Sequence, residues 1–176
     1  MYKRILVPID GSDHASEGLR VACALAEHDQ AKLILLCVTK EDIPEDIVGA
    51  AINEGIVRPA SYREFAGTLD YSSIAPTMMQ VKRETFLARV ANTIAEKVVE
   101  RGTAFASDHN VSEVMTLVRS GHPDDRILEV ADDYHADLIV IASRGTSGIE
   151  TLFDPSIAQS VRDRAKCPCL VLYRSL

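Results

Sequence analysis

The chain has 176 residues, 47% of them hydrophobic, and a formal net charge of −7. This length suits a single domain that can bury a proper core. The negative charge argues against nucleic acid or an anionic membrane as a partner, because both attract clustered Lys and Arg side chains. The first residues, MYKRILVPID, hold no apolar run long enough for a signal peptide or a membrane span, so we expect a cytoplasmic protein without membrane insertion.

Short, nearly continuous apolar runs predict buried strands of a parallel sheet. The runs KRILVPI, LILLCV, LIVIAS and CLVLY occupy residues 3–9, 33–38, 138–143 and 169–173, and VSEVMTLVRS at 111–120 is a fifth predicted strand. Apolar residues at helical spacing predict helices at 12–29, 85–106 and 122–136, the first of them capped by Ser12 or Asp13. Strands and helices therefore alternate, which is typical of an α/β fold with right-handed crossovers.

The segment Lys40–Gln80 interrupts this alternation, because it has three prolines, three glycines and no long apolar stripe. A structureless loop of this length is unusual inside a compact domain. We expect one domain over residues 1–176 with this segment inserted in it. It leaves the second strand just after Val38, so it either covers a ligand site or docks a protein partner. A solvated loop that contacts nothing is the alternative.

Two loops follow strands and carry chemistry suited to a ligand. In VPIDGS, Asp10 and Ser12 emerge at a strand end, and Asp10 can accept hydrogen bonds from ribose hydroxyls or an amino group. Capping of the next helix is the alternative role for this loop. In ASRGTSG, at 142–148, glycines, hydroxyls and Arg144 precede a helix, and free N–H groups at a helix start attract anions. Ligands of open α/β sheets bind at such strand ends.

Residues for catalysis or metal binding cannot be assembled from the sequence. The four cysteines form no CxxC pair, and histidines are absent around Cys167 and Cys169, so we expect reduced thiols that pack in the core and no metal site. His122 stands beside Pro123 at a strand-to-helix turn, where entry into the helix is the simplest role. We therefore expect no enzyme, although a slow ATPase activity is not ruled out.

Four segments together resemble the universal stress protein family, also called the UspA family. They are KRILVPIDGS, LILLCV, SGHPDDRILEVADDYHADLIVIASRG and CPCLVLYR. The resemblance covers the start through Thr39 and Thr85 through Tyr173, which is all but the inserted segment. It implies a Rossmann-like open sandwich, with a five-stranded parallel sheet of order 3-2-1-4-5 and helices on both faces. It also implies homodimers joined through the last strand, here Cys167–Arg174.

Many members of this family bind ATP, and the resemblance transfers their site to particular residues here. Pro8, Asp10, Val38 and Ile141 would line the adenine pocket. The family's signature is Gly, two residues, Gly, nine residues, then Gly-Ser or Gly-Thr. When this spacing is aligned with the present sequence, its four defined positions are Ala142, Gly145, Pro155 and Ser156. Arg144 lies between the first two. The phosphates would meet Gly145, Ser156 and the N–H of Ile157.

The phosphate end departs from that signature. Ala142 adds a methyl group where the family's backbone comes close to the ribose. Pro155 removes an N–H donor, at a cost of roughly 1.5–3 kcal/mol when the acceptor is charged. Asp154 is a good N-cap that would take the remaining N–H groups and repel a phosphate. Mg²⁺ can bridge carboxylate and phosphate.

Two functions consequently remain open at this point. In the first, the chain is a cytoplasmic, ATP-binding stress-response regulator that acts as a dimer. In the second, it is a nucleotide-free dimer that acts through protein contacts, as do family members that regulate membrane transporters. The sequence names neither the ligand, the partner nor the inducing stress.

Overall fold

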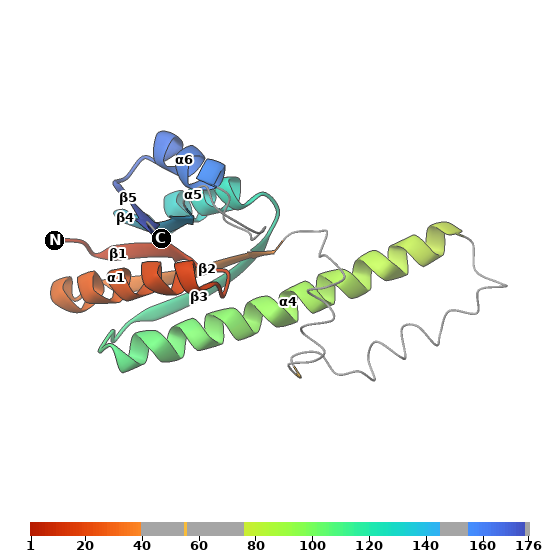
Figure 1. The fold of residues 1–176 in the computed structure, drawn as a ribbon, viewed down its shortest axis with the longest axis horizontal. Helices are drawn as coiled ribbons and strands as arrows, with labels where there is room; N and C mark the ends of the chain where they lie inside the picture. The colour runs from red at the N-terminus through yellow and green to blue at the C-terminus, as the bar shows by residue number, and fades with distance from the viewer. Residues whose placement is uncertain (40–54, 56–75, 145–154, 175–176) are drawn as a thin grey trace.

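The computed structural model describes residues 1–39, 55, 76–144 and 155–174, and for 76–83, 144, 155 and 174 it describes only the backbone. Strands and helices alternate along this chain (Figure 1). In order they are β1 (Arg4–Pro8), α1 (Asp13–Asp29), β2 (Lys32–Thr39), α4 (Pro76–Asp108), β3 (Val114–Ser120), α5 (Pro123–Asp133), β4 (Leu138–Arg144), α6 (Pro155–Arg164) and β5 (Cys169–Arg174).

The strands form one parallel sheet in the order β3-β2-β1-β4-β5, as the family resemblance implies. β1 is central and pairs with β2 on one side and β4 on the other. The chain therefore builds outward from β1 in one direction and then reverses to build β4 and β5 in the other. The two edge strands of the described sheet are β3 and β5.

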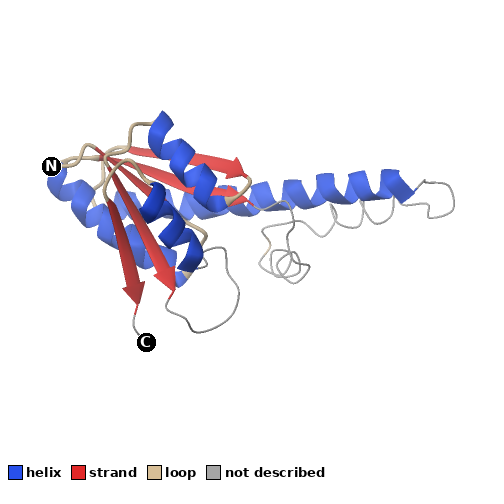
Figure 2. Cartoon of the chain, turned by 90° about the horizontal axis from the view of Figure 1, so that it is seen from above, coloured by secondary structure: helices blue, strands red, loops and turns tan. Residues whose placement is uncertain are grey.

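Alternate residues of each strand point to opposite faces, and each face is covered by two helices (Figure 2). Ile5, Val7, Leu33 and Leu35 pack with α1 and α4. Their neighbours along the strands pack with α5 and α6; these are Leu6, Ile34, Leu36, Ile139 and Ile141. Burial on both faces explains why the strands read as continuous apolar runs and not as alternating ones.

Local residue chemistry sets where the helices begin. Ser12 is the N-cap of α1, and its Oγ accepts a hydrogen bond from the N–H of Ala15 (3.2 Å). His122 occupies the N-cap of α5 without a side-chain cap, and Pro123 follows as the first helical residue. Pro155 is the first residue of α6. The predicted helix entries at Ser12, His122 and Pro155 are therefore confirmed, whereas the proposed cap Asp154 lies outside the described residues.

The inserted segment ends earlier than the sequence suggested. We expected it to continue to Gln80, but α4 already begins at Pro76, so its last five residues are helical. A proline at a helix start is permitted because its missing N–H would have no partner there anyway. Both views show the amino-terminal part of α4 extending past the sheet (Figures 1 and 2). Residues 40–54 and 56–75 lie outside the described part, and with them the expected cover.

All four cysteines are free thiols. Cys23 and Cys37 are buried between the sheet and α1 and α4, and burial raises the pKa of Cys23 to about 11. Cys167 and Cys169 pack against the opposite core, and burial raises the pKa of Cys169 to about 11. The expected reduced packing role is confirmed. Among the helices described, none is both long and apolar enough to cross a bilayer.

Candidate functional site

The reversal of strand order falls between β1 and β4. In open α/β sheets a crevice forms at this point, outside the carboxyl ends of the strands, and ligands bind there. In this chain the loop Asp10–Ser12, which joins β1 to α1, lies at these carboxyl ends. The end of β4 and the start of α6 lie there too. The loop Asp10–Ser12 and the end of β4 therefore lie at the same end of the parallel strands, whereas residues 145–154 fall outside the described part.

The apolar residues predicted for the site share one face of the sheet. Pro8 and Val38 are buried, Val38 with 5% of its surface exposed, and Ile141 is 1% exposed. Val38 and Ile141 belong to the core beneath α5 and α6, and the register Pro8↔Leu36 puts Pro8 on the same face. The ends of three adjacent strands thus provide a continuous apolar floor, which is typical of small-molecule sites.

Asp10 lies two residues after the end of β1, and its carboxylate is oriented by the backbone. Its Oδ1 accepts a hydrogen bond from the N–H of Ser12 (2.9 Å). Gly11 between them has φ +81°, a left-handed conformation that favours glycine. We find no contact to Oδ2 among the described residues, so that oxygen can accept a hydrogen bond from a ligand hydroxyl or amino group.

The negative charge of Asp10 affects the pKa of a neighbouring thiol, that of Cys37. Burial, and secondly the negative charge of Asp10, raise the pKa of Cys37 to about 12. Cys37 is only 4% exposed and stays neutral at physiological pH. Its side chain therefore fills space in the core and does not act as a nucleophile.

The second half of the site comprises the end of β4 and the start of α6. Ala142 is 8% exposed, Arg144 is the last residue of β4, and Pro155 opens α6. Ser156 is exposed, and Ile157 packs half-buried against the core beneath α6. The side chain of Arg144, and all of Gly145, fall outside the described part.

Ala142 directs its methyl group at helix α1. A Cβ atom built on Gly18 would lie 3.3 Å from the Cβ of Ala142 and 3.5 Å from its N atom. Val140, two residues earlier in β4, faces the same core beside α1. The methyl group that we expected to crowd a ribose is thus accommodated by a glycine in the helix opposite.

Sequence reasoning missed a polar pair at the same edge of the sheet. The hydroxyls of Thr39 and Ser120, at the ends of β2 and β3, hydrogen-bond each other (2.8 Å). The N–H of Gly121 donates to the C=O of Thr39 (3.0 Å). Thr39 and Ser120 are the last residues of their strands, and that position was the available signal.

Catalytic and metal-binding groups do not converge in the described part of the chain. No cluster of three or more His, Cys, Asp or Glu suited to a metal occurs there. His122 is exposed at the N-cap of α5. Among the described residues, one cavity of about 240 Å³ lies between α5 and the end of α6. Another of about 170 Å³ lies between α1 and α4 and is also lined by Ile9 and Gly11, on either side of Asp10. Neither is lined by Pro8, Val38 or Ile141.

A doubly wound α/β fold, with a parallel sheet whose strand order reverses between β1 and β4, is the class that these features define. A model of the universal stress protein family matches residues 1–172, so the chain belongs to that family. The chain is 27% identical over 172 residues to universal stress protein YxiE of Bacillus subtilis, a match that covers 98% of this chain and 99% of that one.

Solved structures of the family share the fold. The universal stress protein UspA from Lactobacillus plantarum superposes with a TM-score of 0.66 at 23% identity, over 97% of both chains. A universal stress protein in complex with cAMP gives 0.62 at 21% identity, over 99% of both. A family protein of Arabidopsis thaliana with AMP bound gives 0.60 at 14% identity, over 98% of this chain and 92% of that one.

Proposed function

We propose that this chain is a cytoplasmic, non-catalytic regulatory protein that binds an adenine nucleotide at the carboxyl edge of β1 and β4 and acts as a homodimer. One observation carries the proposal. Three apolar residues at the ends of adjacent strands, Pro8, Val38 and Ile141, form a floor on one sheet face. Asp10 follows β1 at the same end of the strands, and its Oδ2 has no contact among the described residues. An adenosine group needs this combination, because its base is flat and apolar while its edge and ribose donate hydrogen bonds.

The ligands of two relatives support the choice of nucleotide. The structures with cAMP and AMP both hold an adenosine group with one phosphate. Their likeness to this chain extends to the fold, so they indicate which ligands to test first. AMP is the simplest of these probes, and MgATP tests whether a longer phosphate chain is accepted.

The phosphate end of the site is the weaker half. Pro155, at the first position of α6, offers no N–H. We therefore propose that the base and ribose supply most of the affinity. Arg144, Gly145, Ser156 and the N–H of Ile157 would hold the phosphate, with Mg²⁺ reducing repulsion by Asp154 in the case of ATP.

The homodimer would form through β5. Leu170 and Tyr173 on this strand are 36% and 60% exposed, and β5 is an edge of the sheet. An exposed apolar edge strand invites pairing with another strand. A second copy of β5 would satisfy the outward-facing backbone groups and cover both side chains.

A nucleotide-free dimer is the second candidate function, favoured by Pro155 in place of the signature's glycine. In that case the protein acts only through its surfaces, and the edge strand β5 is the surface best suited to a protein partner.

Released ligand and direct titration separate the two candidates. The purified full chain is heat-denatured, its supernatant is analysed for nucleotides, and the stripped protein is titrated with AMP and MgATP by calorimetry. Under the proposal, an adenine nucleotide is released or binds with one site per chain. Absence of both release and binding at millimolar ligand would leave the nucleotide-free dimer.

A further inference from the structure

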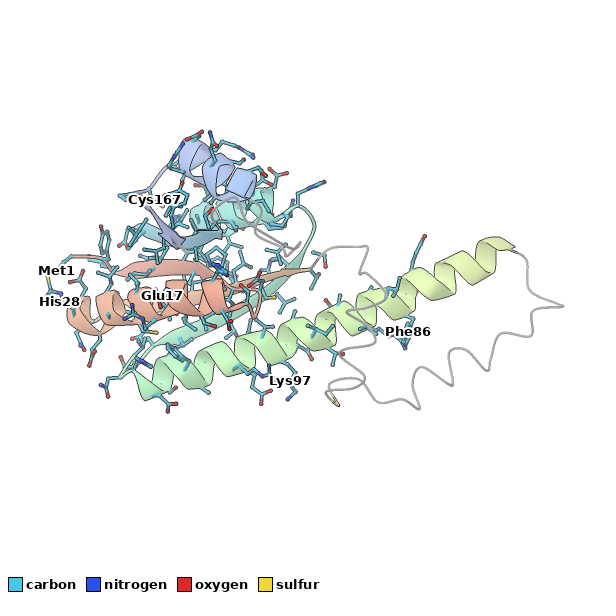
Figure 3. The ribbon with its side chains drawn as sticks, in the orientation of Figure 1. Met1, Glu17, His28, Phe86, Lys97 and Cys167 are labelled. Carbon is cyan, nitrogen blue, oxygen red and sulfur yellow. The ribbon has the colours of Figure 1, made fainter. Side chains whose placement is uncertain are left out.

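The connection from α6 to β5 holds two thiols that are separated by a single proline. Cys167 follows α6, Cys169 is the first residue of β5, and Pro168 lies between them. Figure 3 labels Cys167 on this connection. Both thiols are free, and both side chains pack against the same core, beneath α5 and α6. The two Sγ atoms therefore lie on one face of the sheet, as alternate residues of an extended chain do.

The chain between these thiols is short enough for a disulfide. Alternate Cα atoms of an extended chain lie about 6.7 Å apart. Disulfides join Cα atoms that are about 4.4–6.8 Å apart, most often about 5.5–6 Å. A bond between Cys167 and Cys169 therefore requires the chain at Pro168 to shorten by about 1 Å. The other two cysteines, Cys23 and Cys37, belong to the core across the sheet from this pair.

Pro168 restricts how that shortening can occur. Its ring fixes φ near −65°, a value common to extended and helical backbone, so the chain shortens by rotation about ψ. This rotation turns the C=O of Pro168. In the reduced protein that C=O accepts a hydrogen bond from the N–H of Ile139 (3.0 Å), at the start of the ladder between β4 and β5. The disulfide and this hydrogen bond thus require different conformations of one residue.

Cys167 is the thiol that a small oxidant reaches first. It is half-buried and lines the cavity of about 240 Å³ between α5 and the end of α6, so hydrogen peroxide can reach its Sγ atom. Burial raises the pKa of Cys167, and burial raises the pKa of Cys169 to about 11. Both thiols are therefore protonated at neutral pH and resist mild oxidants.

We propose that Cys167 and Cys169 are a redox pair, which hydrogen peroxide converts to an intramolecular disulfide that frees the start of β5 from β4. The reduced pair permits the hydrogen bond between Pro168 and Ile139, and the oxidised pair breaks it. Disulfides that form in reducing compartments are usually transient and often redox-sensing, and a pair next to a strand end suits that role. This inference goes beyond the proposed function and does not depend on nucleotide binding.

The oxidation proceeds in two balanced steps. The thiolate of Cys167 attacks one oxygen of the peroxide; an S–O bond forms, the O–O bond breaks, and the leaving hydroxide takes up the thiol proton as water. The thiolate of Cys169 then attacks Sγ of Cys167; an S–S bond forms, and the hydroxyl leaves with the proton of Cys169 as a second water. The two thiols lose two electrons and two protons, and the peroxide accepts them.

Peptide mapping of the full chain tests the disulfide. The reduced protein is treated with hydrogen peroxide, denatured, alkylated at its remaining thiols and digested with trypsin. Trypsin cuts after Lys166 and Arg174 and leaves both thiols in the peptide CPCLVLYR. We expect this peptide to lose two hydrogens and to take up no alkylating group, while Cys23 and Cys37 stay alkylated. Two alkyl groups on the peptide, or a disulfide between two chains, would contradict the pair.

Single variants test the order of the two steps. Cys169→Ala removes the second thiol, so the reaction should stop at a sulfenic acid on Cys167, which a dimedone-type reagent traps. Cys167→Ala should leave Cys169 largely unreacted. Cys37→Ala is the matched control, because it removes a thiol from the opposite core and should leave the disulfide unchanged. Equal trapping at Cys169 in Cys167→Ala would contradict the assignment of Cys167 as the thiol attacked by peroxide.

Hydrogen exchange at Ile139 tests the release of β5. The Ile139 amide should exchange at least about fivefold faster in the oxidised protein than in the reduced one, because one backbone hydrogen bond is lost there. Cys169→Ala treated in the same way is the control, since it forms no disulfide and its Ile139 amide should be unchanged. A disulfide that forms while Ile139 stays equally protected would overturn the proposed link between oxidation and the strand.

Discussion

The carboxylate of Asp10 is held by the N–H of Ser12, two residues further along the chain, at 2.9 Å from Oδ1. Ser12 in turn caps α1 through Ala15. The orientation of Asp10 is therefore set by the same turn that starts the helix. Ser12 therefore performs the capping role that the sequence left open, whereas the ligand role of Asp10 stays a prediction.

Replacing Asp10 by Asn tests the ligand role of that oxygen. The amide keeps an acceptor for Ser12 N–H but loses the charge and one acceptor, so AMP affinity should fall about tenfold, equivalent to about 1.4 kcal/mol. Calorimetry with AMP measures the change. Asp13→Asn is the matched control, since it removes an equal charge from the exposed first turn of α1 and should leave affinity within about twofold. If both variants lowered AMP affinity equally, the lost affinity would reflect the reduced negative charge of the region and not a contact between Asp10 and the ligand.

Val171→Pro should abolish the homodimer without unfolding the chain. The C=O of Pro168 accepts from the N–H of Ile139 in β4, so Leu170 and Leu172 continue that ladder and the N–H of Val171 points away from it. Proline is tolerated in an edge strand where the lost N–H faces outward. Sedimentation should then show a folded monomer.

Leu172→Pro is the matched control for that experiment. It removes an N–H on the β4 side of β5 and should lower the free energy of unfolding by about 1–3 kcal/mol, since one ladder hydrogen bond is lost and its acceptor is left unpaired. A Val171→Pro protein that sediments as an unaltered dimer would place the interface elsewhere.

Removing the two residues that oppose a bound phosphate should raise the affinity for phosphorylated ligands. Pro155→Gly combined with Asp154→Leu restores an N–H donor and removes a like charge, so ATP affinity should increase at least about tenfold, or roughly 1.4 kcal/mol. Adenosine is the matched ligand, because it lacks phosphate and should bind both proteins equally. An equal gain for adenosine, or no gain for ATP in a folded variant, would show that this loop does not set phosphate affinity.

The contact between α5 and α6 predicts a pH-dependent stability. The hydroxyl of Ser160 donates to Asp124 (2.7 Å). This bond is the largest cause that lowers the pKa of Asp124 below its ordinary value of 3.8; backbone N–H groups of Asp125 and Asp124 and, last, the Arg164 guanidinium lower it further. A carboxyl with a lowered folded-state pKa stabilises the fold above its unfolded pKa, and this stability is lost as pH falls through the folded value.

Ser160→Ala should therefore raise the pKa of Asp124 and reduce the free energy of unfolding at neutral pH by about 1 kcal/mol. The difference from wild type should narrow only below the ordinary carboxyl pKa of 3.8. Urea titrations across this range, with NMR titration of Asp124, measure both quantities. A stability difference that does not change with pH would assign the effect to packing of Ser160.

Much of the fold could be predicted from sequence because local patterns specify it. The apolar runs located every strand of the sheet, and Ser12, Pro123 and Pro155 located three helix starts. The start of α4 at Pro76 was missed, since its first turns carry no apolar stripe to distinguish them from the preceding loop. The order of the strands was predicted from the family resemblance, because apolar runs alone do not show which strands lie next to each other in a sheet.

The face of the sheet on which the predicted site residues lie could be derived from the sequence, but the packing around them could not. Pro8, Val38 and Ile141 share a face because strands alternate with period two. The contact between Gly18 and Ala142 joins residues far apart in the chain, and only the packing of α1 on β4 reveals it. A glycine inside a helical pattern was the sequence signal for that close approach.

The central claim is that an adenine nucleotide binds at the edge formed by β1 and β4. The most direct test is an NMR titration of the full chain with AMP, following backbone amides. We expect saturable shifts at the loop Asp10–Ser12, at the end of β2 near Val38, at the end of β4 from Ile141, and at Ser156 and Ile157. Shifts centred on the cavity between α5 and α6, or no shifts at millimolar AMP, would contradict the claim.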